Sequence, residues 1–216
     1  MNTTSLVIGA SGGIGAALAD RLAQDGPVTR LSRRIDGLDV TDPASVDAAL
    51  APLSGFDRVF LATGILAPPG GAPEKALSQI DAGAMARVLA VNAVGTALVL
   101  RHLPTLLAAG GRAGVLTARV GSIGDNRMGG WHAYRASKAA ANMLVRGAAI
   151  EIARRDKAAV VAALHPGTVE TPFTAGYKAR KLHPAEAADR LVGVLDGLSP
   201  DRTGQFHDHA GAPVEW

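Results

Sequence analysis

Apolar residues follow two alternating patterns along the 216-residue chain. Short uninterrupted apolar runs that stop near glycine or proline are typical of strands buried on both faces of a parallel sheet. Between them lie longer segments in which apolar residues recur every three or four positions, which is typical of helices. The predicted strands are Ser5 to Ile8, Val28 to Leu31, Gly37 to Val40, Phe56 to Ala62, Gly114 to Ala118, Val160 to Leu164 and Gly204 to Phe206.

Capping signals help to place the helices between these strands. Asp42 suits an N-cap and Pro43 the first helical position, so a helix is predicted from there to Leu50. A loop rich in proline and glycine, Ala67 to Pro73, precedes a helical region that ends near Leu107. The other predicted helices are Ile14 to Ala23, about His132 to Arg155, and Pro184 to Leu195.

Strands that alternate with helices predict an α/β fold with a doubly wound parallel sheet, covered by helices on both faces as a three-layer α/β/α sandwich. The sequence contains no internal repeat, low-complexity tract or linker, so we expect residues 1–216 to form a single domain. Ligands of such sheets bind beyond the carboxyl ends of the strands, and the loops that follow each strand are therefore the places to search for chemistry.

The first strand leads directly into a glycine-rich loop. Gly9, Gly13 and Gly15 form a G-x-x-x-G-x-G pattern at the point where a helix begins. Glycines there let the backbone approach a pyrophosphate, whose charge is met by the amides of the helix N-terminus. The alternative is a plain tight turn, but the position favours a dinucleotide. The predicted contacts in this loop are Gly9, Ser11, Gly12, Gly13, Ile14 and Gly15.

The end of the second predicted strand bears on which dinucleotide binds. An acidic residue there binds a free ribose 2′-hydroxyl, whereas arginine accommodates a 2′-phosphate. The chain is basic at this point, with Ser32 and Arg33 as the predicted phosphate contacts, and Asp36 follows only later. NADP(H) is therefore favoured over NAD(H), which stays possible, and the alternative is that the arginines are simply solvated.

The long predicted helix carries a tyrosine and a lysine on one face. Tyr134 and Lys138 are four residues apart and therefore neighbours on the helix surface. Reducing a carbonyl needs a proton donor beside the oxygen. A phenol with a pKa of about 10 needs a shift of roughly 3 units to work near neutrality, and we expect the nearby ammonium to lower the Tyr134 pKa. Ser122 follows a predicted strand, and Asn92 is a polar residue in an apolar helix, where it needs a specific partner.

The glycine loop, Asn92, Ser122, Tyr134, Lys138 and the turn Pro166-Gly167, in this order and spacing, resemble the short-chain dehydrogenase/reductase family over nearly the whole chain. The resemblance implies a Rossmann-type fold. It implies that Tyr134 is the general acid/base and that Lys138 lowers its pKa and holds the nicotinamide ribose. By the same resemblance Ser122 hydrogen-bonds the substrate oxygen, and Asn92 holds a water in a proton relay.

The resemblance also implies further cofactor contacts. Asp39 and Val40 correspond to the adenine contact, and the loop after the Pro166-Gly167 turn faces the nicotinamide, with Val169 and Thr171 near the carboxamide. One loop departs from the family pattern: it has Ala62, Thr63 and Gly64 where many relatives have Asn-Ala-Gly. We expect these three residues to approach the adenosine side without the asparagine's hydrogen bonds.

The closest subgroup is the C-factor-like and carbonyl-reductase-like short members, judged from the compact length, the stretch His165 to Thr171 and the C-terminal sequence. A short segment between Thr171 and Pro184 implies an open site for small or varied carbonyl compounds. Residues predicted either to line that site or to pack the core are Leu66, Met128, Trp131, His132 and Phe173. The family also implies a homodimer or homotetramer built on the helices that carry Asn92 and Tyr134, whose small residues allow close packing.

Composition argues against several other classes. The net charge is +3, the basic residues are scattered and aromatic residues make up 4%, so nucleic-acid binding is not expected. The longest apolar run, Met85 to Leu107, is interrupted by Arg87 and other polar residues, which predicts a buried helix and no membrane span. The chain has no cysteine, and His207 and His209 lack a convincing third ligand, so no metal site is expected.

The first residues lack the features of a secretory signal, which favours a cytoplasmic protein. The predicted function is NADPH-dependent reduction of small aldehydes, ketones or quinones. The alternative is an NAD(P)-binding signalling or redox-sensing module, similar to C-factor, in which turnover is incidental.

Overall fold

The computed structural model describes residues 3–216; Met1 and Asn2, the start of the segment considered for a secretory signal, lie outside the described residues. Its centre is a six-stranded sheet with the order β2-β1-β3-β4-β5-β6, in which every neighbouring pair is parallel. The strands are β1 (Ser5–Ile8), β2 (Val28–Leu31), β3 (Phe56–Leu61), β4 (Leu107–Leu116), β5 (Val160–His165) and β6 (Phe206–Asp208). The predicted doubly wound α/β fold is confirmed.

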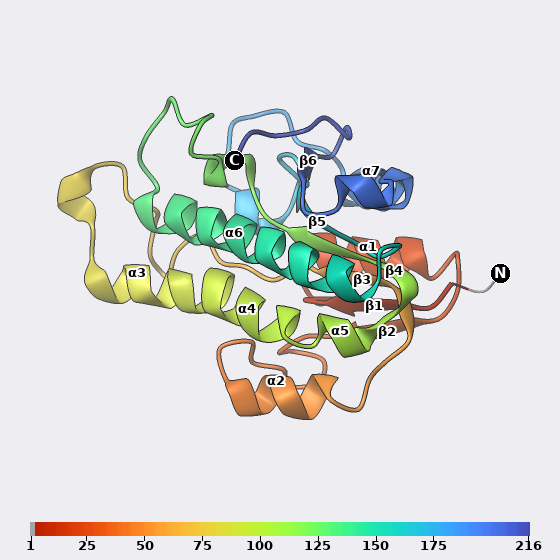
Figure 1. Cartoon of the computed structure of the whole chain (residues 1–216). Coiled ribbons are helices and arrows are strands. Elements are labelled where there is room, and N and C mark those ends of the chain that lie inside the picture. Colours follow the sequence, from red (N-terminus) through yellow and green to blue (C-terminus); the bar gives the residue numbers. More distant parts are fainter. Residues whose placement is uncertain (1–2) are drawn as a thin grey trace.

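Helices cover both faces of the sheet, and the longest of them, α6, crosses one face beside α4 (Figure 1). The helices are α1 (Gly13–Leu22), α2 (Pro43–Leu50), α3 (Ala82–Leu89), α4 (Gly95–Leu100), α5 (Leu103–Leu106), α6 (His132–Arg155) and α7 (Pro184–Gly197). Asp42 caps α2 as predicted, since its side chain accepts a hydrogen bond from the Ala44 amide at 3.0 Å.

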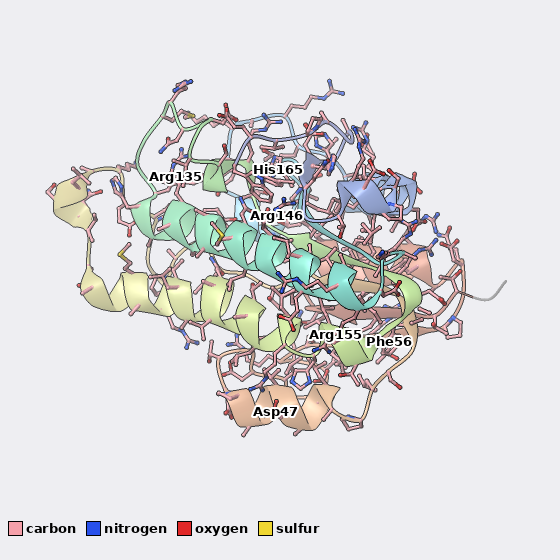
Figure 2. The ribbon with its side chains drawn as sticks, viewed as in Figure 1. Asp47, Phe56, Arg135, Arg146, Arg155 and His165 are labelled. Atoms are coloured by element: carbon pink, nitrogen blue, oxygen red, sulfur yellow. The ribbon has the colours of Figure 1, made fainter. Side chains whose placement is uncertain are left out.

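Two hydrophobic cores, one on each side of the sheet, hold the three layers together. Leu18 and Leu22 of α1 pack with Leu191 and Leu195 of α7 on one side. On the other side, α2, α4, α5 and α6 contribute a larger core that includes Val145. Asp47 of α2, labelled in Figure 2, forms an ion pair with Arg101 and a hydrogen bond with His102 at 2.9 Å. These contacts tie α2 to the end of α4.

The prediction of a strand at Gly37 to Val40 is wrong. Gly37 has a left-handed φ of 81°, which a strand does not contain. The Asp36 carboxylate accepts hydrogen bonds from the Ser32 and Leu38 amides and thereby holds the backbone in a turn. Leu38 and Val40 are nevertheless buried, because they pack into the larger core from a loop. Their apolar pattern therefore indicated burial correctly, but it did not indicate pairing with a neighbouring strand.

The helical region predicted to end near Leu107 is interrupted more than expected. A π-helical turn, Ala90–Val94, separates α3 from α4, and β4 already begins at Leu107, seven residues before the predicted start. The final strand is also displaced, to Phe206–Asp208. Ala82–Leu100, with a mean hydropathy of 1.6, is long and apolar enough to span a membrane by length and composition alone. It forms instead part of the helical layer, where Val88, Val91 and Val99 are buried and α3 and α4 contact α6.

The sheet order predicts a binding crevice at one point. β1 pairs with β2 on one side and with β3 on the other. The chain therefore continues from β1 to the neighbour on one side and then crosses to the neighbour on the opposite side. The loops after β1 and β3 meet there, and the Ala62 amide donates to the Ile8 carbonyl at 2.7 Å. Ligands of doubly wound sheets bind at such a switch point, beyond the carboxyl ends of the strands.

Candidate active site

The loop after β1 is packed so closely that only glycine fits at two positions. Gly9 has a φ of 93°, and a Cβ there would lie 2.7 Å from the Ala62 carbonyl oxygen. A Cβ on Gly15 would lie 2.1 Å from the Gly9 carbonyl oxygen. The backbone of α1 therefore lies directly against the loop that precedes it. Such contact is what a backbone cradle for a pyrophosphate requires.

The N-terminus of α1 is available to an anion. Gly12 occupies the N-cap with no side-chain capping hydrogen bond, and the first turn carries no acidic residue. Gly12 and Gly13 are exposed. The unpaired amides and the helix dipole together make this end of α1 a suitable place for phosphate. Ser11 and Ile14, the remaining predicted contacts, flank these glycines.

The end of β2 is basic, and its acidic residue is already engaged. Ser32 is buried, and its hydroxyl accepts a hydrogen bond from the Ile35 amide at 3.2 Å. Arg33 is exposed and forms no ion pair with any residue of the described part of the chain. The Asp36 carboxylate is held by two backbone amides of its own turn. Arg34, which the sequence analysis did not select, donates to the Ser11 carbonyl at 2.7 Å and so joins this basic end to the glycine loop.

The loops predicted to face the adenosine contain one orphaned polar atom. The Thr63 hydroxyl is buried and has no hydrogen-bond partner among the described residues, whereas Ala62 is fixed by its bond to Ile8. The Asp39 carboxylate accepts from both the amide and the hydroxyl of Thr41, which lowers its pKa. A buried hydroxyl without a partner at the crevice fits a site whose remaining hydrogen bonds come from a ligand.

The loop after β5 lies on the other side of the predicted crevice. Pro166 and Gly167 turn the chain, and Gly167 has a left-handed φ of 78°. Val169 is buried, and Thr171 lies against the glycine loop, because a Cβ on Gly13 would lie 2.5 Å from the Thr171 Cγ2. Burial lowers the pKa of His165, at the end of β5 (Figure 2), to about 4, so this imidazole is neutral.

The tyrosine and lysine of α6 are both buried at the centre of this arrangement. Tyr134 is 7% exposed and Lys138 is 4% exposed. The Lys138 Nζ lies 5.9 Å from the centroid of the Tyr134 ring and donates to the Leu116 carbonyl at 3.0 Å. A Cβ on Gly64 would lie 3.2 Å from that Nζ, so the loop after β3 reaches the lysine.

The two pKa shifts differ from what the sequence suggested. Burial raises the pKa of Tyr134 well above its ordinary value, with a smaller contribution from Tyr177. Burial also lowers the pKa of Lys138 to about 8. The net shift of the Tyr134 pKa is therefore upward, which is opposite to the expected direction. Removal from water disfavours the phenolate, and the Lys138 ammonium is directed to the Leu116 carbonyl.

Ser122 lies on a loop that packs against the same helix. A Cβ on its neighbour Gly121 would lie 2.8 Å from the Lys138 carbonyl carbon, so this loop contacts the backbone of α6. Arg135 of α6, labelled in Figure 2, fixes the loop by donating to the Val120 carbonyl at 3.2 Å. The Ser122 hydroxyl accepts from the Asp125 amide at 3.0 Å. Its own hydrogen has no acceptor among residues 3–216 and is free to be donated.

Asn92 lies in the π-helical turn and is almost fully satisfied by the protein. Its Oδ1 accepts from the Ile65 amide at 2.8 Å, and its Nδ2 donates to the Ile65 carbonyl and to the Ser137 hydroxyl. Ser137 in turn donates to the Tyr134 carbonyl at 2.7 Å. Asn92 thus joins the loop after β3 to the helix of Tyr134. Ser137 was missed by the sequence analysis, because an apparently ordinary serine in a helix gives no signal.

Aromatic rings surround the phenol of Tyr134. Trp131 and Phe173 have ring centroids 6.3 Å and 5.9 Å from that of Tyr134, and Tyr177 lies 5.5 Å from Trp131. Of the five residues predicted to line the site or pack the core, Trp131 and Phe173 therefore reach it. Leu66 and His132 are half-buried, and Met128 is 90% exposed, so it does not pack the core.

In the His207-Asp208-His209 sequence, the first two residues make structural contacts. His207 is bonded to Gln205 and to the Gly211 carbonyl, and Asp208 forms an ion pair with Arg119 at 2.9 Å. Within residues 3–216, no three histidine, aspartate or glutamate side chains are grouped so that they could hold a metal ion.

Comparison with known proteins identifies the family. The family model described as enoyl-(acyl carrier protein) reductase matches residues 17–194. A dehydrogenase of Rhodococcus sp. (strain AD45), 1-hydroxy-2-glutathionyl-2-methyl-3-butene dehydrogenase, is 30% identical over 99% of this chain and 100% of its own length. The chain belongs to the short-chain dehydrogenase/reductase family. It is accordingly an NAD(P)-dependent oxidoreductase of carbonyl or alcohol substrates, as the sequence predicted.

Two further relatives support the predicted subgroup and the fold. The C-signal protein of Myxococcus xanthus is 36% identical over 65% of this chain and 84% of its own length. A short-chain dehydrogenase/reductase of Burkholderia multivorans, solved with bound NADP, is 26% identical, with a TM-score of 0.84 and complete coverage of both chains. The predicted C-factor-like and carbonyl-reductase-like subgroup of the short-chain dehydrogenase/reductase family is confirmed.

Proposed function

We propose that this chain catalyses NADPH-dependent reduction of small aldehydes, ketones or quinones, with Tyr134 as the proton donor. The observation that carries the proposal is the buried pair of Tyr134 and Lys138 on α6, with the Lys138 Nζ beside Gly64 at the crevice. The glycine loop and the loop after β5 meet at the same crevice. An acid group and a dinucleotide cradle are thus brought together by four different segments of the chain.

The cofactor contacts proposed from the sequence fit the structure. The amides at the start of α1 would hold the pyrophosphate, Thr63 has a hydroxyl without a partner among residues 3–216, and Thr171 lies against the glycine loop. When bound, the nicotinamide dinucleotide supplies or accepts the hydride, which no side chain of the protein can do. The full set of proposed contacts is Gly9, Ser11, Gly12, Gly13, Ile14, Gly15, Ser32, Arg33, Asp39, Val40, Ala62, Thr63, Gly64, Tyr134, Lys138, Pro166, Gly167, Val169 and Thr171.

NADP(H) is the favoured cofactor. Arg33 is exposed and unpaired at the end of β2 within the described chain, and Arg34 lies beside the glycine loop. Asp36, the acidic residue that would favour NAD(H), has both carboxylate oxygens engaged by backbone amides. The bound NADP of the Burkholderia multivorans structure supports the same preference. NAD(H) stays the alternative.

The pKa shifts of Tyr134 and Lys138 favour reduction of a carbonyl over oxidation of an alcohol at neutral pH. Because burial raises the pKa of Tyr134, its phenol is protonated at neutral pH and ready to donate to a carbonyl oxygen that gains negative charge. Lys138, with a pKa of about 8, carries a positive charge at pH 7 and stabilises the phenolate that remains. Ser122 has a hydroxyl hydrogen to donate to the same substrate oxygen.

The proposed role of Asn92 is narrower than the family resemblance suggests. Both hydrogens of its amide are donated within the protein, and its Oδ1 already accepts one hydrogen bond. Only the second lone pair of Oδ1 is left to hold a water of a proton relay. We therefore assign Asn92 first to fixing the loop after β3 on α6, and to the relay through that one acceptor.

Apolar or aromatic carbonyl compounds suit the surroundings of the phenol. Trp131 and Phe173 flank Tyr134, and Tyr177 extends this aromatic wall. Flat rings bind apolar and conjugated groups through large contact areas at low conformational cost. The name of the Rhodococcus relative refers to an alcohol that carries a glutathionyl group, so bulky substituents next to the reacting carbon belong in the substrate panel.

A homodimer or homotetramer is proposed through the layer of α4 and α6. Val94 in the π-helical turn just before α4, with Met143 and Ile150 of α6, are exposed apolar residues on neighbouring helices. Not all of the small residues on α6 serve this purpose, because Ala141 and Ala149 are buried against the core. Light scattering should give a mass of two or four chains, and Met143→Glu should lower it.

A cytoplasmic location stays a prediction, to be checked by cell fractionation.

A second candidate function is an NAD(P)-binding signalling or redox-sensing module. The similarity to C-signal of Myxococcus xanthus favours it. A substrate panel assayed with NADPH and NADH, comparing the wild type with Tyr134→Phe, separates the two hypotheses. Tyr177→Phe is the matched control, because it removes the other tyrosine hydroxyl of the chain. We expect reduction that is lost only in Tyr134→Phe, by a factor of about 10² to 10⁴. Tight NADPH binding with no turnover on any carbonyl would favour the module.

A further inference from the structure

Glu74 is a buried carboxylate without a cation beside it. It is 8% exposed, and it forms no ion pair within residues 3–216. Buried carboxylates are costly unless they are paired or hydrogen-bonded. The Glu74 Oε2 accepts a hydrogen bond from the Ala133 amide at 3.3 Å, and the Glu74 carbonyl accepts from the Trp131 amide. Both donors belong to the start of α6, 59 residues further along the chain in the case of Ala133.

The start of α6 lacks a cap of its own. Trp131 occupies the N-cap, makes no side-chain capping hydrogen bond, and is followed by a first turn without an acidic residue. A helix N-terminus has unpaired amides and a partial positive charge, which a carboxylate satisfies. Glu74 supplies both the acceptor and the negative charge from a distant loop. This explains why a carboxylate without a cationic partner is tolerated there.

Trp131, whose amide donates to the Glu74 carbonyl, has an unfavourable backbone conformation. Its φ is 51°, and it is the one residue other than glycine with positive φ in the described chain. The left-handed conformation is unfavourable for a bulky residue and persists only where its surroundings impose it. The Glu74 carbonyl is part of those surroundings, since a Cβ on the preceding Gly130 would lie 3.3 Å from it.

Tyr134 directly follows the amide that Glu74 binds. Ala133 and Tyr134 are consecutive in α6, and Trp131 contacts both the Tyr134 and the Tyr177 rings. Any movement of the first turn of α6 is therefore transmitted to the phenol and to the aromatic wall. Displacing a reacting group by about 1 Å can cost a factor of about 10² in rate.

We propose that Glu74 is a positioning residue for catalysis, which fixes the first turn of α6 and thereby the Tyr134 hydroxyl. The kinetic part of this inference rests on the proposed function. Glu74 does not touch the reacting atoms; it acts through the Ala133 and Trp131 amides. The competing explanation is that Glu74 only stabilises the fold, as a helix cap elsewhere would.

Three substitutions at Glu74 and one control distinguish these explanations. Glu74→Gln keeps the length and the acceptor oxygen, Glu74→Asp keeps the charge but loses reach, and Glu74→Ala loses both. The matched control is Asp156→Ala at the opposite end of α6, where the carboxylate accepts from the Gly110 amide at 2.7 Å. Asp156→Ala removes a similar backbone contact from the same helix, far from the phenol.

Steady-state kinetics give the first test. We expect kcat to fall about tenfold or more in Glu74→Asp and Glu74→Ala, to stay within about threefold in Glu74→Gln, and to be unchanged in Asp156→Ala. The Kd for NADPH should change by a smaller factor than kcat, because Glu74 contacts neither the glycine loop nor most of the other proposed cofactor contacts. If Glu74→Asp lowers only the melting temperature and leaves kcat unchanged, the positioning role is overturned. Glu74→Gln and Glu74→Asp keep the test decisive should the alanine variant not fold.

A measurement without turnover separates this inference from the proposed function. The chain has two tyrosines, so 3-fluorotyrosine labelling gives two fluorine resonances, which Tyr177→Phe assigns. We expect the Tyr134 resonance to shift or broaden in Glu74→Asp and Glu74→Ala but not in Glu74→Gln or Asp156→Ala. An unchanged resonance in the first two would overturn the inference. A protein that reduces no carbonyl but shows these shifts would overturn the proposed function alone.

Discussion

A Cβ atom on Gly13 would lie 2.5 Å from the Cγ2 and 3.0 Å from the Cβ of Thr171. The loop after β1 and the loop after β5 are therefore in direct contact, and together they enclose the proposed pyrophosphate site. Overpacking a well-fitted contact costs about 1–3 kcal/mol. We expect Gly13→Ala to weaken NADPH binding about tenfold or more, measured by fluorescence titration.

The side chain of Thr171 offers an internal control for this prediction. Thr171→Ser removes the Cγ2 methyl group, so Gly13→Ala combined with Thr171→Ser should bind NADPH more tightly than Gly13→Ala alone. No such rescue is expected for Gly15→Ala, whose Cβ would meet the Gly9 carbonyl oxygen at 2.1 Å. If the double variant binds as weakly as Gly13→Ala, the contact with Thr171 is not what requires glycine at position 13.

Cofactor preference should depend on Arg33. Hydrogen bonds to charged groups contribute about 1.5–3 kcal/mol, so Arg33→Ala should weaken NADPH binding by a factor of about 10 to 100. NADH has no 2′-phosphate, and its Kd should change little. Arg34→Ala should weaken both cofactors, because Arg34 donates to the Ser11 carbonyl of the glycine loop. Arg30→Ala is the control, since Arg30 forms an ion pair with Asp20. Equal losses for both cofactors in Arg33→Ala would contradict the assignment.

The sequence predicted some elements to the residue and failed at others for identifiable reasons. Val28–Leu31 and His132–Arg155 have the predicted bounds, because local apolar patterns and flanking turns mark both ends. Gly37 to Val40 has a similar pattern but no strand, because pairing depends on a partner that local residues do not reveal. The prediction that this segment is buried was correct, but the prediction that it pairs as a strand was wrong.

In the candidate site, too, the sequence revealed features that depend on local spacing and missed those that depend on distant contacts. The Tyr134 and Lys138 pair was visible from its helical spacing, and the glycine loop from its place after a strand. The sequence did not show that the Lys138 ammonium points toward the Leu116 carbonyl, because this contact depends on a strand end 22 residues earlier in the chain. Ser137 and Arg34 also act through contacts with distant backbone or side-chain atoms. Contacts of this kind require the tertiary structure.

The buried ammonium of Lys138 should make stability depend on pH. Its pKa in the folded protein is about 8, compared with the ordinary lysine pKa of 10.5, so the unfolded chain binds more protons between these pH values. Stability therefore rises with pH in that interval, by up to about 3 kcal/mol for such a shift. Lys138→Met lacks this group and should not show that gain. Urea unfolding of both proteins at pH 7, 8, 9 and 10 measures the difference.

The informative quantity is how the difference in stability between the wild type and Lys138→Met changes with pH. Lys138→Met also removes the donor of the Leu116 carbonyl, which costs a roughly constant amount at every pH. Other titrating groups are shared by the two proteins and cancel. Parallel stability curves from pH 8 to pH 10 would show that the Lys138 pKa is not lowered in the folded protein.

Carbonyl reduction should decline above about pH 8 because of Lys138 and not because of Tyr134. Burial raises the pKa of Tyr134, so its phenol stays protonated there, whereas Lys138, with a pKa of about 8, loses the charge that stabilises the developing phenolate. We expect kcat to be level below pH 8 and to fall above it with the loss of one proton. Lys138→Arg keeps a positive charge at all these pH values and should abolish the decline, even if its kcat is lower throughout. A decline at the same pH in Lys138→Arg would assign it to another group, with Tyr134 then the first to test.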